Sequence, residues 1–193
     1  MDIRSDLSMK GALGVRVIRA KGPGAAWRLA NFPHWFAGWL KLMVAIAAAK
    51  ISGLPVLYGQ LELRLTKASG EVINYGVVSY RVVTTAFVNN LASNMVSVAS
   101  PTVQAYTYHA SGTGVTAEAT SDTALGTDSG VAHASGTQSN PTANQYRTVG
   151  TQTYSGTLAI TEHGVFSAST VGTLLDRSVF SAVNVANGGF VAA

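Results

Sequence analysis

Three histidines and one neighbouring carboxylate are the most chemically versatile residues in this sequence. They are His109, His133, His163 and Glu162, and imidazole with carboxylate is a donor set that suits zinc. No pair of these histidines has a ligand spacing such as His-x-x-x-His. Adjacent residues on a strand point to opposite faces, so Glu162 and His163 would not share a metal. We therefore predict no metal site and no cofactor.

Two further motifs match chemical sites only in part. Gly112-x-Gly114-x-x-Ala117 has the spacing of a dinucleotide fingerprint, but the residues after it are rich in Thr, Ser and Asp and predict no βαβ unit. Asp176 and Arg177 alternate on a predicted strand, so a hydrogen-bonded turn or an ion pair between subunits explains either side chain. There is no Gly-x-Ser-x-Gly elbow and no cysteine. We predict that the protein is not an enzyme.

Aromatic and basic side chains on the predicted strands are candidates for binding. Tyrosines that alternate on a sheet pack against a neighbouring strand or subunit, or stack on bases or sugars. We favour packing against a neighbouring strand or subunit. The candidate interface residues are Tyr106, Tyr108, Tyr146, Tyr154, Arg147 and Arg177.

The net positive charge of the chain comes from its N-terminal end. Of 193 residues only 11% are charged and 47% are hydrophobic, which is typical of a folded chain rather than a disordered one. Residues 1–42 hold seven basic and two acidic side chains, a local charge of +5, whereas the remainder holds six and seven. The remainder lacks the basic cluster of a nucleic-acid-binding surface, so we predict no specific nucleic-acid partner.

The N-terminal segment, residues 1–54, differs in composition from residues 55–193. It contains all three tryptophans and an apolar run over residues 42–49. The apolar stretch 35–49 is shorter than the ~20 residues of a membrane span and contains Lys41, so we predict no transmembrane span. A secretory signal is the minority interpretation. We favour a poorly ordered basic arm, or translation that begins at Met43.

Residues 55–193 are predicted to form one β domain. Leu61, Leu63 and Leu65 alternate with polar residues, which predicts a half-buried strand over 56–66 that pairs with 71–83 as a hairpin. Thr84 or Thr85 caps a predicted helix whose apolar face is completed by residues 87, 91, 95 and 98.

Further predicted strands come after Pro101, at residues 102–109, 131–138, 145–154, 158–167 and 174–185. Turns are expected at Gly156 and at residues 187–189, the latter without a subsequent strand. The fold class predicted is mainly β: an antiparallel β-sandwich of about seven strands, Ig-like or jelly-roll-like, with one short helix.

Eight short segments occur in an order and spacing that match a known group of proteins. They read YRVVTTAFVN (residues 80–89), YHASGTG (108–114), AEA (117–119), SDTAL (121–125), GTQ (136–138), NQYRTV (144–149), ITEHGVF (160–166) and TLLDRSVF (173–180). In these segments the chain resembles small virion structural proteins of tailed bacteriophages. The N-terminal segment has no counterpart in that group.

The resemblance implies a non-enzymatic, homo-oligomeric component of the phage particle, assembled in the host cytoplasm. We expect a capsid decoration or cement protein that binds the major capsid protein, with a tail or baseplate protein as the alternative. It also implies that Glu162-His163-Gly164 forms a structural corner. A secreted carbohydrate-binding module whose tyrosines stack on sugars is a second alternative.

Overall fold

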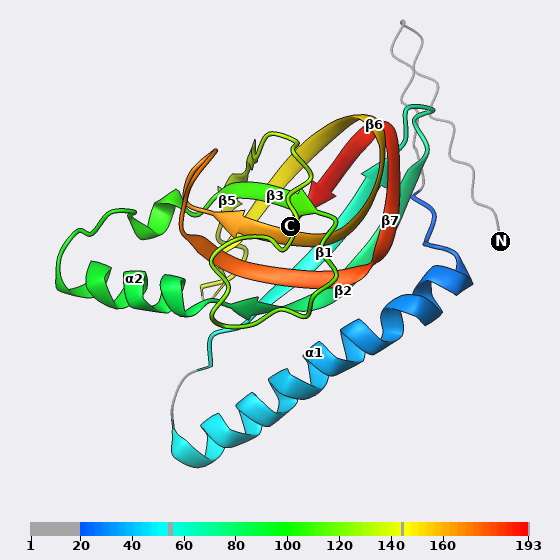
Figure 1. The fold of residues 1–193 in the computed structure, drawn as a ribbon. Helices are drawn as coiled ribbons and strands as arrows, with labels where there is room; N and C mark the ends of the chain where they lie inside the picture. The colour runs from blue at the N-terminus through cyan, green and yellow to red at the C-terminus, as the bar shows by residue number, and fades with distance from the viewer. Residues whose placement is uncertain (1–19, 54–55, 144, 193) are drawn as a thin grey trace, which may run out of the picture.

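The computed structural model describes residues 20–53, 56–143 and 145–192, which form a curled β-sheet and two α-helices (Figure 1). In chain order the elements are α1 (Ala25–Ser52), β1 (Gly59–Thr66), β2 (Val72–Val83), α2 (Thr85–Val96), the 3-10 turn η1 (Val103–Ala105), β3 (Tyr108–Gly112), β4 (Ala134–Ser135), β5 (Thr137–Ser139), β6 (Arg147–Phe166) and β7 (Leu174–Ala192).

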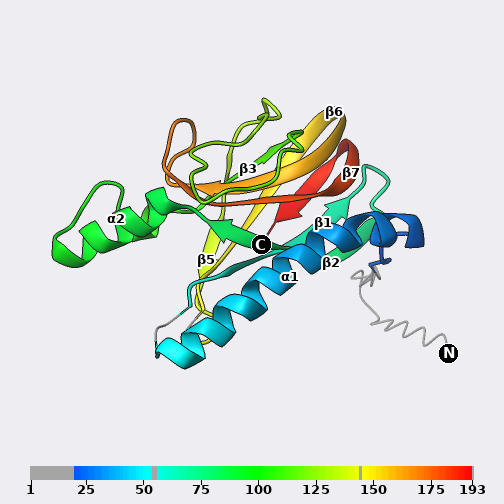
Figure 2. The ribbon, with the colours of Figure 1, turned by 60° about the horizontal axis from the view of Figure 1, so that its bottom comes forward.

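The seven strands form one antiparallel arrangement that curls back on itself. Hydrogen-bonded neighbours run in the order β1-β2-β7-β6-β3-β4, with β5 on β6. The first part of β7 pairs with β2, whereas its last part pairs with β1, which is itself paired with β2. The sheet therefore encloses a core (Figure 2). The predicted fold class, mainly β and sandwich-like with antiparallel strands, is confirmed.

The β1–β2 hairpin was predicted correctly from its period of two. Leu61, Leu63 and Leu65 are buried, and the residues between them are exposed. These leucines pack with Phe180 of β7 and Tyr154 of β6 in the largest core cluster. An alternating strand buries one face, and here that face points into the curl.

The second helix, α2, begins where the sequence predicts. The Thr84 hydroxyl accepts a hydrogen bond from the Phe87 amide at 3.2 Å, as a helix N-cap does. Only the first part of the predicted apolar face is covered, because Phe87 is buried whereas Met95 and Val98 are 82% and 88% exposed. In Figure 1 the later turns of α2 project away from the sheet.

Several predicted breaks in the later strands were wrong. Gly156 does not end a strand, since β6 runs continuously over 20 residues with a register shift between Tyr154 and Thr157. The predicted corner at 162–164 lies within β6, and the predicted turn at 187–189 lies within β7. Long-range pairing outweighs these local turn signals, because β6 and β7 pair with each other along most of their length.

The N-terminal segment contains a long helix that the sequence did not lead us to expect. Residues 25–42, expected to be a poorly ordered arm, form most of α1, a 28-residue helix. Trp27 donates from its indole nitrogen to the Ala182 carbonyl at 3.0 Å. The Asn31 amide bridges two strands, donating to Val78 O and accepting from Ser181 N. Tertiary contacts with β2 and β7 thus fix a helix that carries no side-chain cap.

Candidate functional site

The side of the β6–β7 hairpin that points away from the core of the curled sheet carries a buried carboxylate–guanidinium pair. Glu162 and Arg177 lie diagonally across the two strands, because Gly164 is the register partner of Arg177. The Arg177 Nε and Nη2 atoms lie 2.8 and 2.7 Å from Glu162 Oε2. Arg177 Nη1 also lies 2.9 Å from Asp122 Oδ2. Both Glu162 and Arg177 are almost fully buried.

The Glu162 carboxylate also anchors the irregular loop formed by residues 113–133. It accepts hydrogen bonds from the backbone amides of Gly114, Gly126 and Thr127 at 2.7 to 2.9 Å. A Cβ at Gly114 would collide with this carboxylate, so the loop needs glycine there. We call Glu162, Arg177, Asp122 and the three amides the latch. Its polar groups are used to hold the loop on the sheet.

The charge on Arg177 is stabilised where it lies. Burial opposes that charge, but hydrogen bonds and negative charge from Asp122 and Glu162 outweigh burial and raise the pKa of Arg177. Arg177 is therefore charged, and carboxylates inside the fold surround its guanidinium group, as in a structural ion pair.

On the inner side of the sheet, the buried His163 of β6 lies beside the buried His109 of the neighbouring strand β3. His109 Nδ1 lies 3.1 Å from His163 Nε2, and His109 Nε2 lies 3.1 Å from Thr148 Oγ1. Burial, with a smaller contribution from the positive charge of Arg81, lowers the pKa of His109 to about 3. Burial, Arg81 and then His109 lower the pKa of His163 well below its usual value. Both rings are therefore neutral near pH 7.

A second buried ion pair lies on this inner face. Arg81 Nη1 of β2 lies 2.8 Å from Asp176 Oδ1 of β7. Burial raises the pKa of Asp176, although Arg81 counteracts part of that effect. Asp176 thus faces inward and Arg177 outward, and His163 and Glu162 divide in the same way. This confirms the predicted alternation, and it replaces the suggested ion pair between subunits with contacts inside one chain.

His109, His133 and His163 do not come together at one site. His133 stacks on Phe166 at a centroid distance of 5.0 Å and lies 3.5 Å from Asp128, apart from the pair formed by His109 and His163. Among the described residues no group of three or more His, Asp or Glu side chains is placed to hold a metal ion.

The six predicted interface residues are not brought together on one surface. Tyr106, Tyr154 and Arg177 are buried inside the fold, so they cannot contact a partner while the chain stays folded. Burial raises the pKa of Tyr154 to about 12. Tyr108 is half-buried and packs near Phe166.

Tyr146 and Arg147 are the exposed members of that set. The Tyr146 hydroxyl donates to the Tyr106 carbonyl at 2.5 Å and accepts from the Gln138 amide. Arg147 lies 3.5 Å from Glu62 in a solvent-exposed pair. They are the two predicted residues that a partner can reach directly.

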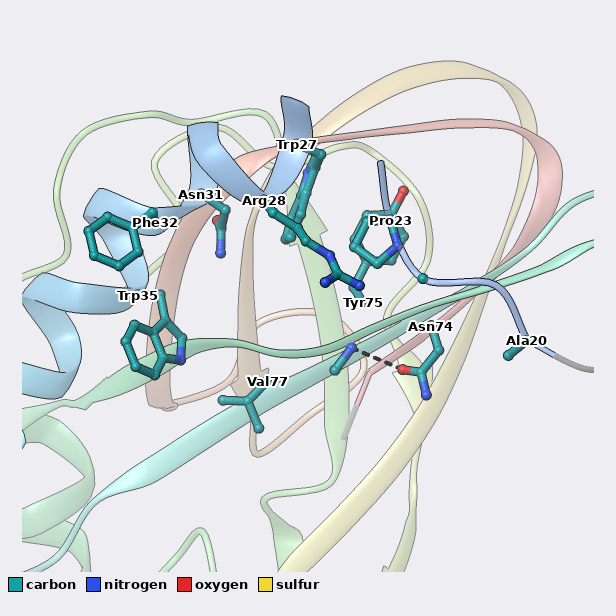
Figure 3. Close-up of a pocket in the computed structure, with 12 residues that line it drawn as sticks. Ala20, Pro23, Trp27, Arg28, Asn31, Phe32, Trp35, Asn74, Tyr75 and Val77 are labelled. Carbon is teal, nitrogen blue, oxygen red and sulfur yellow. Dashed lines mark hydrogen bonds between the residues drawn. The ribbon is translucent and has the colours of Figure 1, made fainter. Parts of the chain in front are cut away.

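A groove of about 660 Å³ lies between α1 and β2 (Figure 3). Trp27, Phe32 and Trp35 line it from the helix, and Tyr75 lines it from the strand. Figure 3 shows Arg28 extending from α1 across the groove towards β2. None of the described acidic residues lines it, so its described lining holds one cation among aromatic rings and no acid–base pair.

The side of α1 that faces away from the sheet is apolar. Residues 29, 33, 36, 40, 44, 47 and 51 recur at steps of three or four and so lie on one face. The large side chains of this face range from 41% exposed for Phe36 to 89% for Ile51. Phe32, Phe36 and Trp39 stack in series at centroid distances of 5.5 and 5.8 Å. We call residues 29, 33, 36, 40, 44, 47 and 51 the outer face.

By length and composition, α1 is the one described helix that could cross a membrane. The predicted apolar stretch was too short because it began at Trp35, whereas the helix begins at Ala25. The length argument against a span was therefore wrong. The absence of a span stays a prediction.

Two groups of residues were not predicted from the sequence. Arg81 and Asp122 were not singled out, although a charged residue at an inward position of a predicted strand, as at Arg81, is a usable signal. The outer face was also missed, although its period of 3.6 from Leu29 to Ile51 is visible in the sequence.

Comparisons of this chain with family models, with curated proteins and with solved structures gave no match in any of the three.

Proposed function

We propose that this protein is a structural subunit of a tailed-bacteriophage particle. The proposal starts from the order and spacing of the eight segments that resemble phage virion proteins. A capsid decoration or cement role, with the major capsid protein as partner, is the specific form we favour. A tail or baseplate location is the variant.

The observation that carries the structural role is the use made of the buried ionisable groups. Glu162 and Arg177 fasten a loop, Arg81 and Asp176 join two strands, and His109 and His163 bond to each other. In each set the buried groups bond to partners inside the chain, an arrangement that favours rigidity over turnover. A rigid β scaffold that presents exposed surfaces suits a subunit repeated many times in a particle.

The carbohydrate-binding alternative receives less support. It needs exposed rings, yet Tyr106 and Tyr154 are buried and the Tyr146 hydroxyl is engaged within the chain.

The experiment is a quantitative protein inventory of purified particles from the phage that encodes this chain. We expect the chain in intact particles after washing in high salt, at a copy number close to that of the major capsid protein. A copy number fixed by tail symmetry would support the tail variant. Absence of the chain from intact, infectious particles would overturn the proposal.

A further inference from the structure

We propose that the outer face of α1 docks on an anionic lipid surface, with the helix lying in the plane of the membrane interface. This inference goes beyond the virion role and does not depend on it. It concerns the side of α1 that is turned away from the sheet, over which no other described helix or strand lies (Figures 1 and 2).

The first argument is the size and continuity of the apolar surface. From Leu29 to Ile51 the outer face runs for about 33 Å at 1.5 Å per residue. Large apolar side chains exposed along a whole helix are unusual on a folded chain and mark a binding surface. The opposite side of α1 is already occupied by the sheet, through Trp27, Asn31 and Gly38.

The second argument is the placement of charge. At 100° per residue, Lys50 lies on one flank of the outer face and Lys41 on the other, roughly 80° and 100° from Leu40, whereas Arg28 extends over the groove. None of the three is in an ion pair among the described residues. Long basic side chains beside an apolar stripe extend towards lipid headgroups while the stripe enters the acyl region.

The third argument is the sign of that charge. Residues 20–52 contain four lysines and arginines and no acidic residue. Lys21 is paired with Glu71 at 3.4 Å, which leaves Arg28, Lys41 and Lys50 as the cations of α1. Two copies of α1 packed face to face would bring like charges together without a compensating carboxylate. An anionic surface complements this helix, and a second copy does not.

The aromatic residues agree with an interfacial position. Phe32, Phe36 and Trp39 form one stacked series on the N-terminal half of α1. Aromatic rings are enriched at the level of lipid headgroups, where one part is wet and another is apolar.

The test uses the full chain and unilamellar vesicles of phosphatidylcholine, with or without phosphatidylglycerol. The three tryptophans of the chain, Trp27, Trp35 and Trp39, all lie in α1, so tryptophan emission reports on this helix alone. We expect flotation with the phosphatidylglycerol vesicles, a blue shift of emission and quenching by brominated lipid. Binding should weaken as salt rises.

Two variants separate the apolar and electrostatic contributions. Phe36→Ser with Leu40→Ser should weaken vesicle binding at least about tenfold, because two large side chains no longer enter the lipid. Lys41→Gln with Lys50→Gln should weaken it about fivefold per lysine on anionic vesicles only. Val115→Ser with Val171→Ser is the matched control, since both valines are exposed on loops of the β domain. Thermal melts confirm that each variant folds.

Three outcomes overturn the lipid inference. They are no flotation of the wild-type chain with anionic vesicles, equal binding by the outer-face variant, or a concentration-dependent dimer that the outer-face variant abolishes. The last outcome would assign the outer face to a second copy. None of these outcomes bears on whether the chain occurs in particles.

Discussion

On the β6–β7 hairpin, the charged side chains of Glu162 and Arg177 are buried and paired, whereas on α1 the apolar side chains of Phe36 and Leu40 face outward. In the hairpin, polar groups lie inside because partners satisfy them there. On the outer face, apolar groups lie outside because none of the described elements covers them. The β6–β7 hairpin therefore contributes to stability, whereas α1 keeps an exposed apolar surface that is available for binding.

The largest expected effect comes from breaking the latch. Arg177→Met should lower the free energy of unfolding by about 3–5 kcal/mol, because the Glu162 carboxylate would stay buried without its counter-ion. Chemical denaturation measures this loss. Arg147→Met is the matched control, and its exposed pair with Glu62 should be worth less than about 1 kcal/mol. Equal losses for the two variants would refute the distinction between buried and exposed pairs.

The second-largest effect is expected from acid, which should lower the free energy of unfolding through the buried histidines. The lowered pKa of His109 means that the unfolded chain binds a proton below about pH 6.5 while the folded chain resists it down to about pH 3. Stability is therefore lost as the pH falls through this window, by about 2 kcal/mol at pH 5 from His109 alone. Denaturation at pH 7 and pH 5 measures the slope.

The raised pKa of Asp176 acts in the opposite direction, since the folded chain then takes up that proton more readily than the unfolded chain. The double variant His109→Asn with His163→Asn isolates the histidine contribution. It should lose most of the acid dependence, whereas His133→Gln should keep it. An unchanged slope in the double variant would show that the histidine pair is not the acid-sensitive element.

A smaller effect is expected at the start of α2. The Thr84 hydroxyl caps the helix and donates to the Leu174 carbonyl at 2.5 Å, joining α2 to β7. Thr84→Ala should cost about 1–2 kcal/mol, and Thr84→Ser should restore most of it. Thermal melts compare the two, and a serine variant as unstable as the alanine variant would point to the lost methyl group instead.

The smallest effect on stability is expected on the outer face of α1. Phe36→Ser and Leu40→Ser should each change the free energy of unfolding by less than about 1 kcal/mol, because both side chains are exposed and Phe36 stacks on rings of its own helix. Leu63→Ala, at a fully buried position, should cost about 2–5 kcal/mol in the same assay. A loss above about 1 kcal/mol for either outer-face variant would mean that this surface contributes to the fold.

The sequence predicted local structure well wherever one strong period or one capping residue determines it. The leucines of β1 and the cap at Thr84 are such cases, as is the division of Glu162 from His163. Prediction was wrong where distant pairing decides. Gly156 signals a turn, but pairing with β7 carries β6 through it. Neither the partner of Arg177 at Asp122 nor the position of α1 on β2 can be derived from spacing.

By itself the sequence determined a mainly β chain, the alternation of faces along its strands and a net positive charge confined to its N-terminal part, because each can be read from neighbouring residues and fixed backbone periods. Only the tertiary structure decided which charges are buried together and which apolar face is left uncovered by the described elements. Those outcomes depend on which segments meet across the curled sheet, and contacts between distant residues leave no fixed spacing in the chain.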